Sequence, residues 1–247
     1  MVWKNITFDK CYSFIQAEFR PKKGALLLSA KPAVTITRMT GSGGHTVASL
    51  LAEYLQMRIV GHEPWTVFDQ NLVETVLEDH KIQERVTDFM EEGHTSMLKD
   101  AVEVWIESSP SSWTVVQWIN ATILRLAQAG NVILIGRGAT VIASKVVTAF
   151  HVRLIASMEN RIERVQHVYD LDRKAAISYI KKKDDGRRRY LKDYFDADID
   201  DPFLYHLTIN MDTVGFDEAA ALIGEEVLRR FRMKTVIKEV EAETEVI

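Results

Sequence analysis

Glycines, hydroxyl side chains and a histidine are concentrated in the segment Thr40-Gly41-Ser42-Gly43-Gly44-His45-Thr46. Glycine allows positive φ angles and a close approach of the backbone to a ligand. Successive N–H groups of such a loop can point into one concavity, and a helix that begins there adds partial positive charge. The pattern predicts an anion site suited to nucleotide phosphates, formed by Gly41, Ser42, Gly43, Gly44, His45 and Thr46.

The residues on either side of this loop predict the elements that would position it. The β-branched run Val34-Thr35-Ile36-Thr37 favours an extended strand over residues 33–37. After the loop, apolar residues recur at helical spacing and predict a helix over residues 46–55. A strand, a glycine-rich loop and a helix in this order are the context that a phosphate-binding loop requires.

The loop differs from the phosphate-loop template GxxxxGK[ST] because no lysine follows the glycines. Gly44 stands where the lysine belongs, or His45 does if the alignment is shifted by one residue. The positive charge on a transferred phosphoryl group would then come from Arg38, from His45 or from a more distant arginine. Thr46 offers a hydroxyl ligand for Mg²⁺, and the alternative is a threonine that only caps or begins the helix.

A second candidate site follows the apolar run of residues 131–135, which ends in Gly136-Arg137-Gly138. A continuous apolar run is typical of a buried parallel strand, and ligands of open α/β sheets bind at the carboxyl ends of such strands. Arg137 could hold a phosphate or a nucleotide edge with two parallel hydrogen bonds. The alternative is an arginine that pairs with a nearby carboxylate for structural reasons.

The densest basic segment, Lys181 to Tyr190, contains the run Asp184-Asp185-Gly186-Arg187-Arg188. Lysines alone would indicate a solvated helix face. Arginines at the mouth of a phosphate loop instead suit a lid, placed at about residues 181–192, that covers a nucleotide and stabilises transferring charge. Asp184 and Asp185 would orient these arginines or hold a hydrated metal.

Composition limits the other possibilities. With 47% hydrophobic residues over 247 positions, the chain is long enough for one α/β domain with a full core. A net charge of −4 argues against a general nucleic-acid binder. The lone Cys11 excludes an intramolecular disulfide. Neither a signal peptide nor a membrane-spanning stretch is recognisable, so we expect a cytoplasmic protein.

The remaining pattern divides the chain into an N-terminal helix and linker (1–31), a main domain (32–231) and a charged C-terminal tail (232–247). A helix is expected to open at Phe68-Asp69, with Asp69 as its N-cap. Residues 84–126 look mostly helical, with a break at residues 108–112 where Ser111 or Ser112 would cap the next helix. Further strands are expected near 57–60, at 150–155 and at 207–210, and a last helix at about 216–231.

The glycine loop, the Gly-Arg-Gly strand end and the arginine segment, in this order, resemble the cytidylate kinase-like family of P-loop proteins. The resemblance covers about Ala33 to Leu228 and includes Arg161-Ile-Glu-Arg164 and Leu207-Thr-Ile-Asn210. It implies the α/β fold of P-loop NTPases, with a parallel five-stranded sheet flanked by helices, a helical acceptor-binding region and a short lid. It also implies ATP and Mg²⁺ as cofactors, with catalytic roles for Arg38, Arg137, Arg187 and Arg188.

The chain also departs from cytidylate kinases, which carry Asp-Gly-Arg-Asp where this sequence reads Ile135-Gly-Arg-Gly138. The leading hypothesis is phosphoryl transfer from ATP to a nucleoside monophosphate such as CMP or dCMP, or to a similar small phosphorylated acceptor. The missing carboxylates motivate the alternative of a kinase for another small metabolite. The missing lysine motivates a nucleotide-binding regulatory module without catalysis. A small-molecule nucleotide is the expected partner, and the pattern is compatible with a homodimer.

Overall fold

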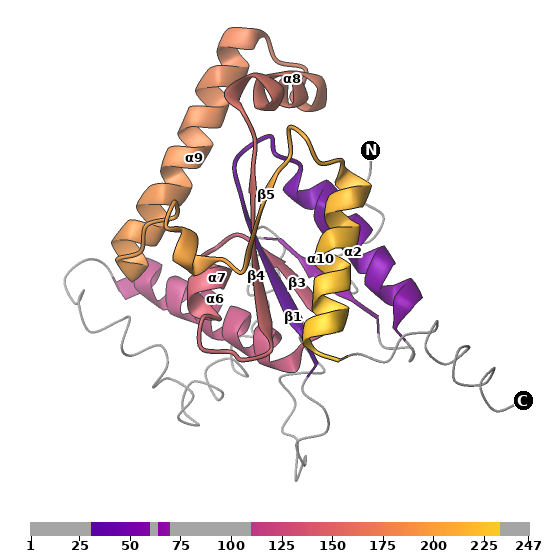
Figure 1. The fold of residues 1–247 in the computed structure, drawn as a ribbon. Coiled ribbons are helices and arrows are strands. Elements are labelled where there is room, and N and C mark those ends of the chain that lie inside the picture. The colour runs from indigo at the N-terminus through magenta and orange to yellow at the C-terminus, as the bar shows by residue number, and fades with distance from the viewer. Residues whose placement is uncertain (1–30, 60–63, 70–109, 233–247) are drawn as a thin grey trace, which may run out of the picture.

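A computed structural model describes residues 31–59, 64–69 and 110–232. Their core is a five-stranded parallel sheet with the strand order β2-β3-β1-β4-β5 (Figure 1). The strands are β1 (Ala33–Arg38), β2 (Thr66–Phe68), β3 (Val132–Ile135), β4 (Ala149–Ile155) and β5 (Leu207–Asn210). This confirms the expected α/β fold with five parallel strands.

The central strand β1 pairs with β3 on one side and β4 on the other, so that Val34 lies opposite both Ile133 and Phe150. Both faces of these strands are buried, as expected for a parallel sheet covered on both sides. Strand β3 is apolar throughout, whereas β1 and β4 also bury Thr35, His151 and Arg153. Because all strands are parallel, their carboxyl ends share one edge of the sheet, where the loops after β1 and β3 and residue Asp69 after β2 are located.

Helices cover both faces of the sheet (Figure 1). Helices α2 (Gly44–Arg58) and α10 (Phe216–Arg230) pack on one face, where Leu51 and Ile223 join Ile36 in a buried cluster. Helices α6 (Pro110–Ala129) and α7 (Ala139–Ile142) pack on the other face, around Leu124 and Leu134.

A helical pair extends beyond the sheet. Helix α8 (Met158–Tyr169) follows β4 and packs against the long helix α9 (Arg173–Phe195), as Figure 1 shows. Side-chain caps from Ser157 and Asp172 begin the two helices. A small apolar cluster of Ile162, Val165, Ala176 and Ile180 joins them. The basic segment 181–192, predicted to be a lid, lies within α9, and a single 3₁₀ turn (Pro202–Leu204) then precedes β5.

Two predictions about local structure were wrong. Instead of a strand near 57–60, α2 continues to Arg58, and Ile59 N–H still donates to the carbonyl of Leu55 at 3.0 Å. The second strand of the sheet is β2, which the sequence did not indicate. Helix α6 already begins at Pro110, before the expected caps, because proline has no N–H to leave unpaired in a first turn.

Other predictions concern segments outside the described ranges: the N-terminal helix and linker, almost all of the C-terminal tail, the helix after Asp69 and most of the region 84–109. Within the described part of the chain, no helix is both long and apolar enough to cross a membrane.

Candidate functional site

The glycine loop lies between β1 and α2, as expected. Ser42 turns the chain back, because its N–H and its hydroxyl both donate to the carbonyl of Met39, at 3.2 and 2.9 Å. Gly41 and Gly43 have φ angles of +83° and +88°, a region that side chains rarely adopt. Helix α2 starts at Gly44, with Gly43 as its N-cap. The loop therefore brings a helix N-terminus to the carboxyl end of the central strand.

Neighbouring elements press against the loop and explain the need for glycine. A Cβ atom at Gly41 would lie 2.7 Å from the carbonyl oxygen of Arg161 in α8. A Cβ atom at Gly43 would overlap the ring of Phe216 at the start of α10. The loop is thus fixed between two helices as well as by its own turn.

The side chain of Arg38 packs against Gly44, one of the two positions at which the template lysine could be aligned. A Cβ atom at Gly44 would lie 2.8 Å from Cγ of Arg38, so the arginine stem packs where a side chain at position 44 would begin. The guanidinium reaches Gly136 at the end of β3, where a Cβ atom would overlap Nη1 of Arg38. Burial and the nearby Arg187 lower the pKa of Arg38 to about 9, while Asp69 and Asp184 act in the opposite direction. A half-buried cation thus joins the glycine loop to the end of β3.

Asp184 of α9 connects the arginine segment to the loop. Its Oδ1 accepts hydrogen bonds from the backbone N–H and the hydroxyl of Thr40, at 2.8 and 2.7 Å. Arg187 donates to the same carboxylate at 2.8 Å and to the Thr40 hydroxyl at 2.6 Å, and Arg161 of α8 pairs with the other oxygen. Burial lowers the pKa of Arg187, and Asp184 opposes that shift. The structure therefore places Arg187 at the loop, with Asp184 orienting it.

Arg188 lies elsewhere, although it is the next residue. It pairs with Asp185 at 3.3 Å and with Asp200 at 3.0 Å on an exposed part of the surface. Successive residues of a helix point about 100° apart, so two neighbouring arginines cannot both face the loop. The structure does not bring Arg188 together with Arg38 and Arg187.

Two arginines that contact the loop, Arg161 and Arg164, were not among the predicted site residues. Arg161 donates to the carbonyl of Thr40 at 3.4 Å. Arg164 donates to the carbonyls of Gly41 and Met211, at 3.4 and 2.8 Å. Their spacing of three residues on a predicted helix was a signal that both share one face. Together they hold α8 against the loop.

A small, partly open pocket lies at the ends of β2 and β3. Its walls are formed by Phe68, Asp69, Ile123, Leu134, Ile135, Gly136, Arg137 and Ala139. Gly136, Arg137 and Gly138 have φ angles of +78°, +48° and +68°, so the chain turns sharply after β3. Because this turn carries Arg137 to the pocket wall, the pocket has a cation suited to an anionic ligand.

Aromatic side chains from α9 lie on the other side of Arg137. Its guanidinium carbon is 5.3 Å from the centre of the Tyr190 ring, within the range of a cation–π interaction. Burial lowers the pKa of Arg137 and raises the pKa of Tyr190 to about 12. Helix α9 thus contacts both the glycine loop, through Asp184, and the arginine of the pocket.

Asp69 and His45 link the pocket to the loop. His45 lies in the first turn of α2, and its Nε2 is 3.4 Å from a carboxylate oxygen of Asp69. Asp69 follows β2 directly and also lines the pocket. The sequence assigned Asp69 only a capping role, because the strand that precedes it is short and was placed elsewhere.

The donor set fits Mg²⁺ that arrives with a nucleotide. Thr46 lies in the first turn of α2 and is half-buried, and Gly43 rather than Thr46 is the N-cap. Within the described ranges, no group of three or more histidine, cysteine, aspartate or glutamate residues could hold a metal by itself. Mg²⁺ is commonly bound by one or two protein oxygens together with substrate phosphates.

The parallel sheet and the glycine loop between its central strand and α2 define the class: this is the α/β fold of P-loop NTPases. The sequence profile of the cytidylate kinase-like family matches residues 33–213. The chain belongs to this family. No curated protein matches the sequence.

Solved structures are similar to this chain at low sequence identity. An uncharacterized protein from Eubacterium ventriosum is 22% identical with a TM-score of 0.59, over 80% of this chain and 98% of that one. A shikimate kinase from Bacteroides thetaiotaomicron is 12% identical with a TM-score of 0.43, over 78% and 97% of the two chains. A gluconokinase from Sinorhizobium meliloti is 12% identical with a TM-score of 0.41, over 83% and 94%.

Proposed function

We propose that this protein transfers the γ-phosphoryl group of Mg-ATP to a small acceptor that carries an anionic group. The nucleoside monophosphates CMP and dCMP are the first acceptors to test. The observation that carries the proposal is the position of Arg38, which runs from the glycine loop at Gly44 to Gly136 at the edge of the pocket. A cation in this position would face the phosphoryl group throughout its transfer.

On the donor side, the loop from Gly41 to Thr46 would bind the ATP phosphates through its backbone and the N-terminus of α2. Arg38 would supply the charge that a lysine supplies in the template, and Arg187 would add a second cation from α9. The Thr46 hydroxyl would help to hold Mg²⁺, which would supply further neutralisation of the developing charge. Arg188, for which the sequence also predicted a catalytic role, pairs with Asp200 on the exposed surface and is not part of the proposed machinery.

On the acceptor side, Arg137 would hold the anionic group of the acceptor in the pocket between β2 and β3. Catalysis would then rest on alignment of the acceptor and on charge neutralisation, the two effects that dominate phosphoryl transfer. ATP as donor is consistent with the expected cytoplasmic location.

A kinase for a different small metabolite is the second candidate. Ile135 and Gly138 flank the Gly136-Arg137 turn in the sequence, where cytidylate kinases carry two aspartates. This difference removes polar groups that would recognise a nucleoside and favours a smaller acceptor. The third candidate function is a regulatory module that binds a nucleotide but does not transfer a phosphoryl group. The absence of the loop lysine motivates this alternative.

The test is a coupled assay of ADP release with Mg-ATP and a panel of nucleoside monophosphates and small phosphorylated metabolites. ATP binding is measured in parallel by calorimetry. We expect ADP release that depends on one acceptor and falls by two orders of magnitude or more in Arg38→Ala. ATP binding without ADP release across the panel would contradict the kinase and favour the regulatory module.

A further inference from the structure

We infer that the acceptor presents a hydroxyl oxygen to the phosphoryl group, and that the carboxylate of Asp69 accepts the proton of this hydroxyl. The inference rests on the proposed phosphoryl transfer and names the chemical class of its acceptor. The structural basis is the placement of Asp69 between the two halves of the site.

Asp69 and Arg137 stand at corresponding ends of neighbouring strands. Phe68 of β2 lies opposite Leu134 of β3 in the parallel register, so the residues that follow the two strands emerge at one edge of the sheet. Both line the small pocket at the ends of these strands. A ligand in this pocket would therefore contact one carboxylate and one guanidinium.

The carboxylate of Asp69 also faces the donor side. It lies 3.4 Å from Nε2 of His45, in the first turn of the helix that follows the glycine loop. Its charge raises the pKa of Arg38, the cation beside the loop, against the larger effect of burial. The carboxylate is thus located where an acceptor atom in the pocket would approach a phosphoryl group on the loop.

The negative charge of Asp69 distinguishes between two kinds of acceptor atom, a phosphate oxygen and a hydroxyl oxygen. A phosphate oxygen is already anionic and needs no base, and a fixed carboxylate beside it would repel it. A hydroxyl is neutral and a poor nucleophile until its proton is removed, and a carboxylate within hydrogen-bond reach can take that proton. The placement of Asp69 favours a hydroxyl.

The step balances without a further reactant. The hydroxyl oxygen of the acceptor forms a bond to the γ-phosphorus of ATP, and the bond from that phosphorus to the β,γ-bridging oxygen breaks with its electrons going to ADP. The hydroxyl proton goes to the Asp69 carboxylate and then to water. The acceptor class is a small molecule with a hydroxyl for Asp69 and a carboxylate or phosphate for Arg137, and the product is a phosphate monoester.

Water serves as the test probe because it is itself a small hydroxyl nucleophile. The rate of ADP formation from saturating Mg-ATP, without acceptor, is measured for the wild type, Asp69→Asn and Asp69→Glu, with ATP affinity from calorimetry. We expect Asp69→Asn to lower this rate by about 100-fold with ATP affinity within about twofold of wild type, since a general base contributes about that much. Asp69→Glu, which keeps a carboxylate, is expected to retain part of the rate.

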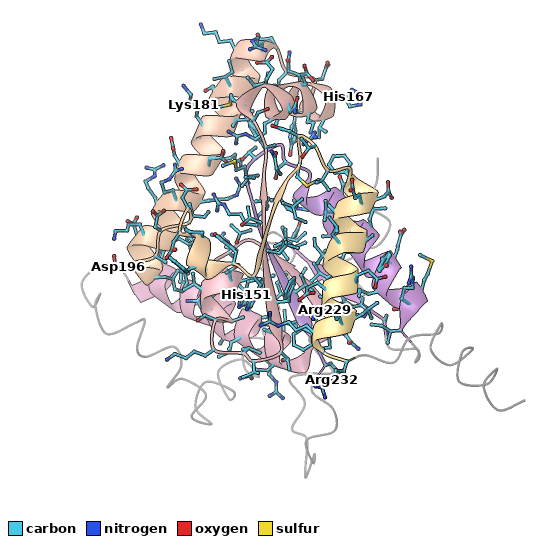
Figure 2. The ribbon with its side chains drawn as sticks, in the orientation of Figure 1. His151, His167, Lys181, Asp196, Arg229 and Arg232 are labelled. Carbon is cyan, nitrogen blue, oxygen red and sulfur yellow. The ribbon has the colours of Figure 1, made fainter. Side chains whose placement is uncertain are left out.

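Asp196→Asn is the matched control. Asp196 is exposed at the end of α9 away from α8 (Figure 2), and asparagine tolerates its left-handed conformation. A rate unchanged in Asp69→Asn would overturn the inference. So would a loss of ATP affinity with no change in the maximal rate, because that result would assign Asp69 only to holding His45 and Arg38.

A second readout uses the product. When CMP or a hydroxy acid such as glycerate is turned over, phosphorus NMR distinguishes a phosphate monoester from the phosphoanhydride of a diphosphate. Formation of CDP, undiminished in Asp69→Asn, would overturn the hydroxyl inference and leave the proposed kinase standing. Bound ATP with neither hydrolysis nor transfer would overturn both.

Discussion

The carboxylate of Asp184 accepts a hydrogen bond from the backbone N–H of Thr40 at 2.8 Å, and this contact joins α9 to the glycine loop. The two residues are 144 positions apart in the sequence. Arg161 and Arg187 pair with the same carboxylate. A single side chain therefore fixes two arginines and a loop residue relative to one another.

The first prediction concerns Asp184→Asn. The substitution removes the charge that both arginines require and turns an amide donor toward one of them. We expect a loss of about 2 kcal/mol in the free energy of unfolding, because hydrogen bonds to charged groups contribute about that much. Urea denaturation followed by circular dichroism measures the change. Asp185→Asn is the matched control, since Asp185 is 62% exposed and should change stability by less than about 0.5 kcal/mol.

The second prediction concerns moving the positively charged side chain from position 38 to position 44. We expect Arg38→Ala to reduce turnover by a factor of about 100 or more, as the loss of a group that stabilises transition-state charge does. The double variant Arg38→Ala, Gly44→Lys should recover part of that loss, because removing the arginine stem makes room for a side chain at position 44. Single-turnover phosphoryl transfer measures both variants.

The single variant Gly44→Lys is the control for the double variant. With Arg38 present, the new Cβ atom would lie 2.8 Å from Cγ of the arginine, so we expect lower stability and no gain in rate. A double variant no more active than Arg38→Ala would show that the position of the cation, and not only its presence, is decisive.

Much of the fold could be predicted from the sequence because its elements are marked locally. The apolar run of β3 and the β-branched run of β1 identify buried strands, and the glycines between 41 and 44 identify the loop. Strand β2 could not be found this way, because three residues give too short a pattern to distinguish from a helix start.

The candidate site was harder to predict because it depends on contacts between distant segments. The sequence indicated that arginines gather in one segment, but only the phase of α9 separates Arg187, at the loop, from Arg188, on the surface. The contact between Arg38 and Gly44 was also not predictable from the sequence. Only the structure shows that the arginine stem packs on the glycine.

The third prediction separates the two neighbouring arginines. Arg187→Ala should lower turnover by a factor of about 100, because Arg187 is the one that contacts Thr40 and Asp184. Arg188→Ala removes only an exposed pair with Asp185 and Asp200, and we expect a change of less than about threefold in rate. Steady-state kinetics of the two variants at saturating ATP measures the difference, and equal losses would contradict it.

The fourth prediction compares two glycines. Gly136 has a φ of +78° and contacts the guanidinium of Arg38, so Gly136→Ala should destabilise the protein by about 2 kcal/mol or more and displace that cation. Gly186 lies inside α9 with open space around it, so Gly186→Ala should stabilise the protein by about 1 kcal/mol through helix propensity. Denaturant midpoints report both, and effects of the same sign would contradict the assignment.

The last prediction concerns the pH dependence of stability, which His151 should dominate. Its ring is buried in the sheet, where Nδ1 lies 2.8 Å from the Thr35 hydroxyl and the ring stacks on His206 (Figure 2 labels His151). Burial, His206 and Arg230 lower the pKa of His151 from 6.5 to about 4. The unfolded chain therefore binds the proton more readily, and stability is lost as the pH falls from about 6.5 to about 4.

The full loss from His151 is about 3 kcal/mol, because each pKa unit corresponds to about 1.4 kcal/mol. Unfolding free energies measured from pH 7 to pH 4 should therefore fall more steeply in the wild type than in His151→Asn. The variant will keep some dependence on pH, because burial and Arg230 also lower the pKa of His206. His167→Gln is the control, since Figure 2 shows His167 at the outer end of α8, and its profile should follow the wild type. Equal slopes for wild type and His151→Asn would contradict the assignment of a buried neutral imidazole.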